Sequence, residues 1–401
     1  MAERASKRKE VTLFVVRTGD SAMVKQLNKS IVLNCIRRSS PISRTSISRM
    51  TGLNKSTVSV LTAELLTEGQ IVELGTGHST GGRRPKLLSF NGRVGLALGI
   101  EVGVTFLRGV LCDLTGNILA SHQMPMPPGR SVEAALSALV QMAQQLMKQA
   151  PKTPMGVLGL GVGVPGVVDR DQGTVLLAPN LGWRDLQLRT LLQQSLGLPV
   201  FLENEANAAA LGEKWFGAGS GVPNMLYVSV GTGIGTGVIL GGQLFRGGHG
   251  LAGEAGHMVL EAGGPPCNCG NRGCWELYAS EAALLRRLRD VSQDAETIYQ
   301  LASRGDPRVV TAISAVGEYL GIGLVSLVNI FDPDLVVIGG PMARCGKWLI
   351  NPAERVLSER LMLRRARNLH ITVGTLGENS CALGAASILV EAHFSSGGMV
   401  V

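Results

Sequence analysis

Two segments of this chain share one design, in which an apolar strand leads through a glycine-containing turn into a second strand. One is LALGIEVGVTFLRGVLCDLTGNIL, beginning at Leu96, and the other is MLYVSVGTGIGTGVILGGQLF, beginning at Met225. Beyond Asn91, further Gly-rich strands alternate with helices, which is typical of the α/β class. A strand–turn–strand unit that occurs twice predicts a duplicated fold of two lobes around a cleft, in which each turn can present backbone N–H groups to a phosphate.

The two glycine turns differ in how closely they would let a phosphate approach. The second turn, Gly231–Gly235, reads GTGIG and has the small residues that a close approach needs. The first turn, Glu101–Thr105, places the β-branched Val104 where the backbone should be bare. Glycines also form tight hairpins that bind nothing, so the turns alone do not establish a phosphate site.

The segment GEAGHMVLEAGGPPCNCGNRGCWE has the spacing of a metal site. Cys267, Cys269 and Cys274 lie within eight residues, and His257 precedes the first of them by ten. Three thiolates and one imidazole complete a closed tetrahedral zinc site of the structural kind. The alternative is a set of reactive or buried cysteines without a ligand. We expect one structural Zn²⁺ per chain, and seven cysteines so placed indicate a reducing compartment rather than a disulfide framework.

Four polar residues are candidates for binding a polyhydroxylated ligand. The stretch FLENEANAAALGE places Asn204 and Glu205 where an apolar run, typical of a buried strand, leads into a helix. Glu254 and Glu276 lie near the two ends of the zinc segment, so the metal would hold them rigidly near Asn204 and Glu205. A carboxylate at a strand end can act as a catalytic base or can hold a sugar hydroxyl. Each acid taken singly also fits a salt-bridged surface.

The positive charge of the chain is concentrated at its beginning. Residues 1–90 hold 15 Lys+Arg and 6 Asp+Glu, whereas residues 91–401 hold 23 and 24. The net charge of +8 therefore arises in the first ninety residues. A basic module joined to a neutral body suggests a polyanion partner for the first part only. A solvated basic tail is the alternative.

Helical patterns in the first ninety residues predict a helix-turn-helix. The first helix begins near Gln26, and its predicted apolar stripe consists of Leu27, Ile31, Val32 and Ile36. SRTSISRMTG predicts a second short helix that Gly52 stops as a C-cap. The third helix has Asn54 as its N-cap, and its predicted inward residues are Val58, Leu61 and Leu65. Two short helices around a Gly-containing turn are typical of a helix-turn-helix.

The start of the third helix carries small polar or cationic groups that can enter a DNA major groove. These candidate DNA-binding residues are Lys55, Ser56, Thr57 and Ser59. They also fit an ordinary capped helix with a polar face. QIVELGTGHSTGGRRPKLLSFN then alternates like a β-hairpin and predicts a wing. Arg83 and Arg84, which follow two glycines, suit the narrow minor groove of A·T-rich DNA.

The hydrophobic pattern excludes a membrane protein. The sequence contains no run of about 18 uninterrupted apolar residues. The apolar part of MAERASKRKEVTLFVV is too short for a signal peptide. We therefore expect a cytoplasmic protein without a membrane partner.

Taken together, these motifs resemble the ROK family (repressors, open reading frames and sugar kinases) over nearly everything from Gln26 to the C-terminus. The zinc segment, VGTGIGTGV and ENEANAAALGE are specific to that family, and GLNKSTVS with GGRRP is most similar to its xylose repressor branch. The resemblance implies an α/β protein with a winged helix-turn-helix over 1–90 and a two-lobed actin-like (ribonuclease H-like) sugar-binding domain over 91–401. The first lobe would span about 94–206 with a C-terminal helix at about 380–394, and the second lobe about 207–379.

The resemblance also implies roles for particular residues. The family's zinc ligands match His257, Cys267, Cys269 and Cys274. Its sugar-contacting positions match Asn204, Glu205, Glu254, His257, Glu276 and, less closely, Asn180. The segment VVIGGPMA, from Val336, matches the one that lies near adenosine in the kinases.

Two departures from the kinases bear on catalysis. The kinases carry Asp-x-Gly-Gly-Thr where this chain has Glu101–Thr105, and an aspartate base where it has Glu205. One extra methylene moves the carboxylate by about 1 Å, enough to cost roughly a hundredfold in a positioned reaction. With Val104 in the phosphate space as well, we do not expect this chain to use ATP.

The sequence thus predicts a sugar-responsive transcriptional repressor rather than an enzyme. It would bind an A·T-rich inverted repeat as a homodimer or dimer of dimers, and a monosaccharide would release it, with xylose favoured and glucose as the other candidate. One alternative is a ROK-type ATP-dependent sugar kinase with an appended DNA-binding module. Another is a regulator controlled by a protein partner.

Overall fold

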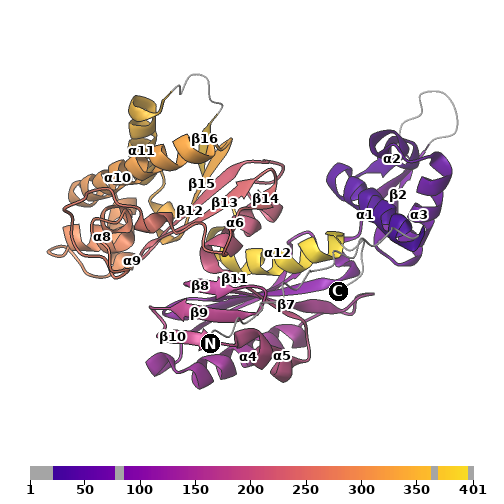
Figure 1. The fold of residues 1–401 in the computed structure, drawn as a ribbon, viewed down its shortest axis with the longest axis horizontal. Coiled ribbons are helices and arrows are strands. Elements are labelled where there is room, and N and C mark those ends of the chain that lie inside the picture. The colour runs from indigo at the N-terminus through magenta and orange to yellow at the C-terminus, as the bar shows by residue number, and fades with distance from the viewer. Residues whose placement is uncertain (1–20, 77–84, 363–368, 396–401) are drawn as a thin grey trace, which may run out of the picture. The chain divides into compact units, whose positions relative to one another are not determined.

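The computed structural model of the protein describes residues 21–76, 85–362 and 369–395, and Figure 1 shows the course of the chain. The chain forms two compact units. The first contains residues 1–91 with 393–401, and the second contains residues 92–392.

The first unit combines a helical part with a small sheet. Its helices are α1 (Ser21–Ser39), α2 (Arg44–Thr51) and α3 (Lys55–Thr67). Its antiparallel sheet has the order β1 (Ile42–Ser43), β3 (Lys86–Phe90) and β2 (Ile71–Thr76). The pairing of β2 with β3 confirms the predicted hairpin at both of its strands. The predicted wing residues Arg83 and Arg84 lie outside the described residues.

The capping residues that begin and end the short helices act as predicted. Gly52 adopts a positive φ of 73° and donates its N–H to the carbonyl of Ser48, which ends α2. The side-chain oxygen of Asn54 accepts the N–H of Thr57 at 2.7 Å and so begins α3. The predicted inward residues of α3 are all buried, and they are Val58, Leu61 and Leu65.

The predicted apolar stripe of α1 is partly wrong. Val32 and Ile36 are buried as expected, but Leu27 is 61% exposed and Ile31 is 38% exposed. At 100° per residue, Leu27 and Ile31 lie on the opposite side of the helix from Val32 and Ile36. The helix packs through the face that also contains Leu33, so apolar residues on the other face remain at the surface.

The second unit contains two five-stranded sheets with the same topology. The first consists of β4 (Leu96–Val102), β5 (Phe106–Asp113), β6 (Ile118–Pro125), β7 (Val157–Val164) and β11 (Val200–Asn204). The second consists of β12 (Met225–Val230), β13 (Ile234–Leu240), β14 (Gln243–Leu244), β15 (Leu335–Gly339) and β16 (His370–Val373). The orders are β11-β7-β4-β5-β6 and β14-β13-β12-β15-β16.

In each sheet the first three strands form an antiparallel meander, and the last two run parallel to the first. This repetition confirms the predicted duplicated fold. A smaller antiparallel sheet inserted before β11 consists of β8 (Val167–Asp169), β9 (Thr174–Ala178) and β10 (Trp183–Leu186).

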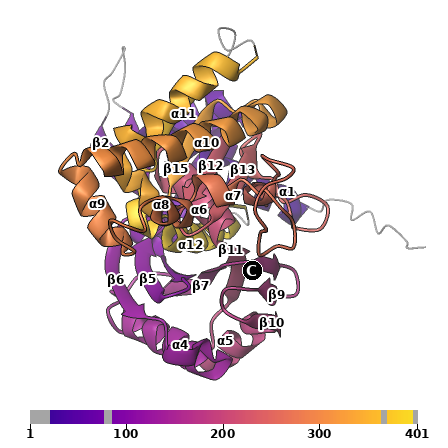
Figure 2. The ribbon, with the colours of Figure 1, turned by 90° about the vertical axis from the view of Figure 1, so that its left-hand side faces the viewer.

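Helices cover each five-stranded sheet and complete its core (Figure 2). The first sheet packs against α4 (Val132–Lys148) and α5 (Leu188–Leu196), whose buried residues include Leu139, Met142 and Leu192. The second lobe contains α7 (Glu276–Ala279), α8 (Glu281–Arg287), α9 (Ala295–Ser303), α10 (Pro307–Phe331) and α11 (Lys347–Arg360).

Among the described residues, α10 alone is long and apolar enough to cross a membrane by length and composition. Its buried residues include Val309, Leu320 and Val328, which belong to the same hydrophobic cluster as Leu226 and Val336 of the second sheet. The packing identifies α10 as a core helix of this lobe.

Two helices lie between the sheets in Figure 1, α6 (Glu205–Phe216) and α12 (Ser380–Ser395). A Cβ atom at Gly99 of β4 would lie 1.8 Å from the carbonyl oxygen of Ala382 of α12. One at Gly384 of α12 would lie 1.6 Å from the carbonyl oxygen of Ala208 of α6. Only glycine permits such close backbone approach. The buried Glu213 of α6 also accepts the N–H groups of Thr375 and Leu376, just before α12.

Candidate functional site

The residues predicted to read DNA lie in the first turns of α3. Lys55, Ser56 and Ser59 are exposed, and Thr57 is half-buried. The same exposed surface includes Val60, which is 55% exposed. Val60 was not among the residues predicted to read DNA, because those were chosen for small polar or cationic side chains.

The four predicted zinc ligands come together in one cluster. The ligand atoms of His257, Cys267, Cys269 and Cys274 all lie within 4.8 Å of one another. His257 ends the short 3₁₀ turn Ala255–His257, whereas the cysteines come from the loop before α7. Isolated bridges from Val259 to Cys274 and from Pro266 to Arg272 shape that loop.

The spacing of these atoms fits a tetrahedral zinc ion. The sulfur atoms of Cys269 and Cys274 are 3.6 Å apart, and Cys267 Sγ lies 3.7 Å from His257 Nδ1. Zn–S bonds of about 2.3 Å at tetrahedral angles would separate two sulfurs by about 3.7 Å. The donor set is the closed Cys₃His type, so an ion bound there would have a structural role.

Asn204 and Glu205 lie where β11 passes into α6. The Asn204 side-chain oxygen caps α6 by accepting the N–H groups of Ala206 at 2.8 Å and Asn207 at 3.1 Å. Its Nδ2 donates to the Gly166 carbonyl at 3.0 Å and to Glu205 Oε2 at 2.8 Å. Asn204 therefore holds the carboxyl group of Glu205 in a fixed orientation. A direct sugar contact by Asn204 stays a prediction.

The carboxyl groups near Glu205 change its acidity. Burial raises the pKa of Glu205 to about 8, and the negative charges of Glu254 and Glu101 act in the same direction. Burial also raises the pKa of Glu101 to about 7, against the opposing charge of Arg108. The pKa of Glu254 is raised by burial and by Glu276, while His257 lowers it. Glu254 and Glu101 thus lie close enough to Glu205 for their charges to affect its pKa.

We expect the pKa of Glu205 to make the folded protein less stable as pH rises. The unfolded chain loses this proton near pH 4.5, but the folded chain keeps it until about pH 8, so the free energy of unfolding falls between those values. The whole shift corresponds to at most about 5 kcal/mol. Because solvent reaches this half-buried group, we expect about 1–2 kcal/mol.

Denaturant unfolding of wild type and Glu205→Gln at pH 5 and pH 8.5 measures this contribution. The wild type should lose more stability than the variant, since glutamine cannot ionise and changes elsewhere are common to both. Parallel losses in the two proteins would show that the Glu205 carboxyl does not carry the effect.

Near the second glycine turn, Glu276 lies close to both the turn and the zinc cluster. Glu276 Oε1 is 3.2 Å from Cys267 Sγ and 3.5 Å from His257 Nδ1. A Cβ at Gly233 would lie 2.7 Å from Glu276 Oε2. The structure therefore brings Glu276, the cluster and the GTGIG turn together, as the sequence predicted for Glu276 and the cluster.

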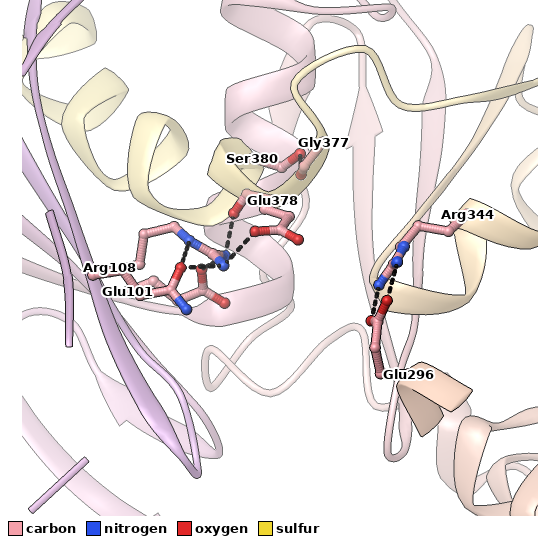
Figure 3. A network of polar contacts seen from close by, with 8 residues as sticks. Glu101, Arg108, Glu296, Arg344, Gly377, Glu378 and Ser380 are labelled. Carbon is pink, nitrogen blue, oxygen red and sulfur yellow. Dashed lines mark hydrogen bonds and ion pairs between the residues drawn. The ribbon is translucent and has the colours of Figure 1, made fainter. Parts of the chain in front are cut away.

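An ion-pair network lies beside the first glycine turn, and Figure 3 shows it together with a separate ion pair of the second lobe. Arg108 of β5 faces Glu101 of β4 across the hairpin, with Nη1 3.4 Å from Glu101 Oε2. Its Nη2 is 2.7 Å from a carboxylate oxygen of Glu378, which lies in the turn before α12. Figure 3 also shows Arg344 paired with both carboxylate oxygens of Glu296, at 2.7 and 2.9 Å. Both guanidinium groups are therefore already engaged by carboxylates.

The segment VVIGGPMA runs along β15 into the 3₁₀ turn Pro341–Cys345. A cavity of about 110 Å³ beside this turn is lined by Tyr299, Arg344 and Trp348, among others. The guanidinium of Arg344 lies 4.9 Å from the centre of the Tyr299 ring. The cavity is therefore small, and two of its lining residues, Arg344 and Tyr299, already stack on each other.

Asn180 is exposed in the turn after β9. A Cβ at Gly166 would lie 3.0 Å from Cα of Ala178, two residues before Asn180. The same Gly166 accepts the Asn204 hydrogen bond, so the turn with Asn180 runs beside Asn204. Its contact with a sugar stays a prediction.

Four residues that form ion pairs near the site were not predicted from the sequence, and they are Arg108, Glu378, Glu203 and Arg246. The cross-strand register of the β4–β5 hairpin was the available signal for Arg108. The other contacts join residues far apart in the chain, for which local spacing gives no signal.

Comparison with known proteins gives consistent relatives. A sequence model described as the ROK family matches residues 97–392. The xylose repressor of Bacillus subtilis (strain 168) is 41% identical over 377 residues, which are 94% of this chain and 97% of that protein.

Solved structures agree with this match. The crystal structure of a ROK family transcriptional regulator, a homolog of the E. coli MLC protein, has a TM-score of 0.79 and 28% identity, and it covers 93% of this chain and 97% of its own. A ROK family glucokinase from Streptomyces griseus, in complex with glucose and AMPPNP, has a TM-score of 0.67 and 32% identity. The match covers 73% of this chain and 98% of the glucokinase chain.

Proposed function

Because this chain belongs to the ROK family, we propose that it is a cytoplasmic, sugar-responsive transcriptional repressor. The observation that carries the proposal is the extent of the similarity. The xylose repressor and the regulator structure correspond to this chain over more than nine-tenths of both lengths. The match to the glucokinase structure covers 98% of the glucokinase chain but only 73% of this chain.

A monosaccharide is the proposed effector, with xylose favoured and glucose as the other candidate. Glu254 and Glu276 offer carboxylate oxygens that accept hydrogen bonds from sugar hydroxyls, and charge-assisted bonds of this kind are the stronger ones. Glu205 offers a carboxyl group that keeps its proton up to about pH 8 and can therefore donate as well as accept a hydrogen bond. Asn204 orients Glu205. His257 and Asn180 complete the proposed set of sugar-contacting residues.

Zinc is the metal proposed for the Cys₃His cluster. Bound zinc would fix the loop from His257 to Glu276 and would deprotonate its thiol ligands. Each of the three cysteines and His257 supplies one ligand atom. The metal therefore supports the sugar site without a catalytic role.

We propose that the protein lacks kinase activity. The first turn has Val104 in place of a glycine, and Glu101 beside it is paired with Arg108. A kinase must bind the phosphates and magnesium with free charged groups. Arg108 and Arg344 both already pair with carboxylates, which leaves them poorly suited to hold ATP.

The second candidate function is an ATP-dependent sugar kinase with an appended DNA-binding module. It is favoured by the similarity to a glucokinase whose structure contains glucose and AMPPNP, and by the bare GTGIG turn. A coupled ADP-release assay with magnesium, ATP and a panel of monosaccharides separates the two. We expect no sugar-dependent ADP, and turnover near the usual range of about 1–10³ s⁻¹ would establish the kinase.

Operator release would follow from linkage between the sugar site and the DNA-binding units of a homodimer or dimer of dimers. Paired recognition helices must meet half-sites about one helical turn apart. A sugar that closes the cleft would change that spacing, so affinity for an A·T-rich inverted repeat would fall. Thermal-shift screening against a panel of monosaccharides tests the proposal first, and an increase in melting temperature with a sugar is the expected result.

We expect the wing arginines to contribute strongly to operator affinity. Arg83→Ala with Arg84→Ala should weaken operator binding about 10- to 100-fold, because two cationic side chains leave the minor groove. For the wild type, affinity should fall by orders of magnitude between about 50 and 200 mM salt. The double variant should have a shallower salt slope. Fluorescence anisotropy with a DNA selected by the wild-type protein from a random library measures both.

Sugar binding serves as the control for this double variant and should be unchanged. The exposed Arg355, which pairs with Glu318 in the second unit, provides a matched substitution, Arg355→Ala, with no expected effect on DNA. Equal operator affinity of the double variant and the wild type would show that Arg83 and Arg84 do not contribute to operator binding.

A further inference from the structure

An ion pair joins the two lobes beside the candidate sugar site. Glu203 lies on β11 of the first sheet, one residue before Asn204, and its side chain is only 5% exposed. Arg246 follows β14 of the second sheet. Its Nε and Nη2 donate to the same oxygen, Glu203 Oε2, at 3.0 and 2.8 Å. The other carboxylate oxygen, Glu203 Oε1, does not contact Arg246 and accepts a hydrogen bond from the backbone next to it.

The second oxygen, Glu203 Oε1, contacts residues at the candidate sugar site. Glu203 Oε1 accepts the backbone N–H of Asn204 at 3.2 Å, and Asn207 Nδ2 lies 3.5 Å from it. The Asn204 side chain in turn donates to Glu205 Oε2 at 2.8 Å. A continuous series of polar contacts therefore connects Arg246 with the carboxyl group of Glu205.

Arg246 also begins the loop that carries Glu254 and His257. Its carbonyl accepts the N–H of Ala252 at 3.0 Å, which closes the loop on itself. The next residue, Gly253, accepts a hydrogen bond from Thr236 Oγ1 of β13 at 2.6 Å. The loop is thus held at its start by the first lobe and at its end by the second.

The chemistry of the pair explains why arginine is needed. A carboxylate buried without a cation is strongly unfavourable, so Glu203 requires a partner. The planar guanidinium offers two N–H groups in a fixed geometry, whereas a lysine ammonium is a point charge on a flexible stem. Arginine can therefore fix the direction as well as the distance of the loop.

We propose that Arg246 is a positioning residue for sugar recognition. Through Glu203 it holds the loop that carries Glu254 and His257 in register with the strand end that carries Asn204 and Glu205. The proposal rests on the proposed sugar-binding function. Arg246 does not touch the sugar, and it acts through the placement of residues that do.

The test compares sugar affinity in full-length variants by isothermal titration with xylose, with glucose in parallel. Arg246→Ala should raise the Kd at least tenfold, and Arg246→Lys should restore part of the loss, to about threefold above wild type. Glu203→Gln, which keeps the shape of the side chain, should resemble Arg246→Ala. In the Glu203→Gln background, Arg246→Ala should have little further effect, since the two residues act as one unit.

Three further measurements separate positioning from general damage. Zinc content and operator affinity without sugar should match the wild type in Arg246→Lys, and Arg355→Ala, which removes the exposed ion pair with Glu318, should leave the sugar Kd unchanged. Equal sugar Kd in wild type and Arg246→Ala would overturn the positioning role of Arg246 and would leave the proposed function standing. A wild type that binds neither sugar would overturn the proposed function and the inference with it.

Discussion

A Glu205→Ala variant is expected to stay on its operator at sugar concentrations that release the wild-type protein. Glu205 is half-buried and held by Asn204, with Glu254 and Glu101 nearby. At pH 8.5, above its pKa of about 8, Glu205 is a carboxylate, and each charge-assisted hydrogen bond that it accepts from a sugar hydroxyl is worth about 1.5–3 kcal/mol. Its loss should raise the sugar Kd about ten- to hundredfold. Calorimetry with the sugar, and anisotropy of the operator complex with increasing sugar, measure the two effects.

Glu205→Gln is the matched variant, because it keeps the size of the side chain and removes its ability to ionise. We expect it to retain more sugar affinity than Glu205→Ala. Operator affinity in the absence of sugar should be the same in all three proteins, because α3, the helix predicted to read DNA, belongs to the other unit. Full sugar release of Glu205→Ala at wild-type concentrations would exclude Glu205 from the effector site.

Loss of zinc is expected to have the second large effect. Purified wild-type protein should contain about one zinc per chain, and Cys269→Ser should reduce that content severalfold. Structural zinc contributes on the order of 10 kcal/mol to the folding of zinc-finger peptides, so the loop bearing Glu276 should lose its fixed position without it. We expect the sugar Kd of Cys269→Ser to rise about a hundredfold. Metal analysis and calorimetry on the same preparation measure both quantities.

Cys35→Ser provides the control for this substitution, because Cys35 is partly exposed in α1 and lies outside the cluster. It should keep both zinc and sugar response. Freshly purified wild-type protein that never met a chelator and still contains no zinc would refute the metal site. Normal sugar binding by zinc-free Cys269→Ser would instead show that sugar recognition does not require the metal.

The elements that local patterns determine were predictable. The repeated strand–turn–strand segments gave the two-lobed fold, and strand order later repeated in both sheets. Asn54 and Gly52 marked helix ends because capping depends on a few neighbouring residues. The metal cluster was predictable for the same reason, since its four ligands lie close in the sequence.

Features set by packing between distant residues were not predictable. Leu27 and Ile31 looked like core residues, but α1 packs through another face. Glu101 was singled out from the sequence but its partner Arg108 was not, and neither member of the Glu203–Arg246 pair was predicted. The acidity of Glu205 likewise depends on burial and on charges from distant segments. Apart from the hairpin register that places Arg108 opposite Glu101, a single sequence contains no local signal for such contacts.

The most direct test of the account is the affinity of the full-length protein for its selected operator, measured by anisotropy with and without each monosaccharide of a panel. We expect that one sugar, with xylose favoured, weakens operator binding at least tenfold in the absence of ATP. That sugar should be the one that raises the melting temperature. Operator affinity that is unchanged by every sugar in the panel would contradict the central claim.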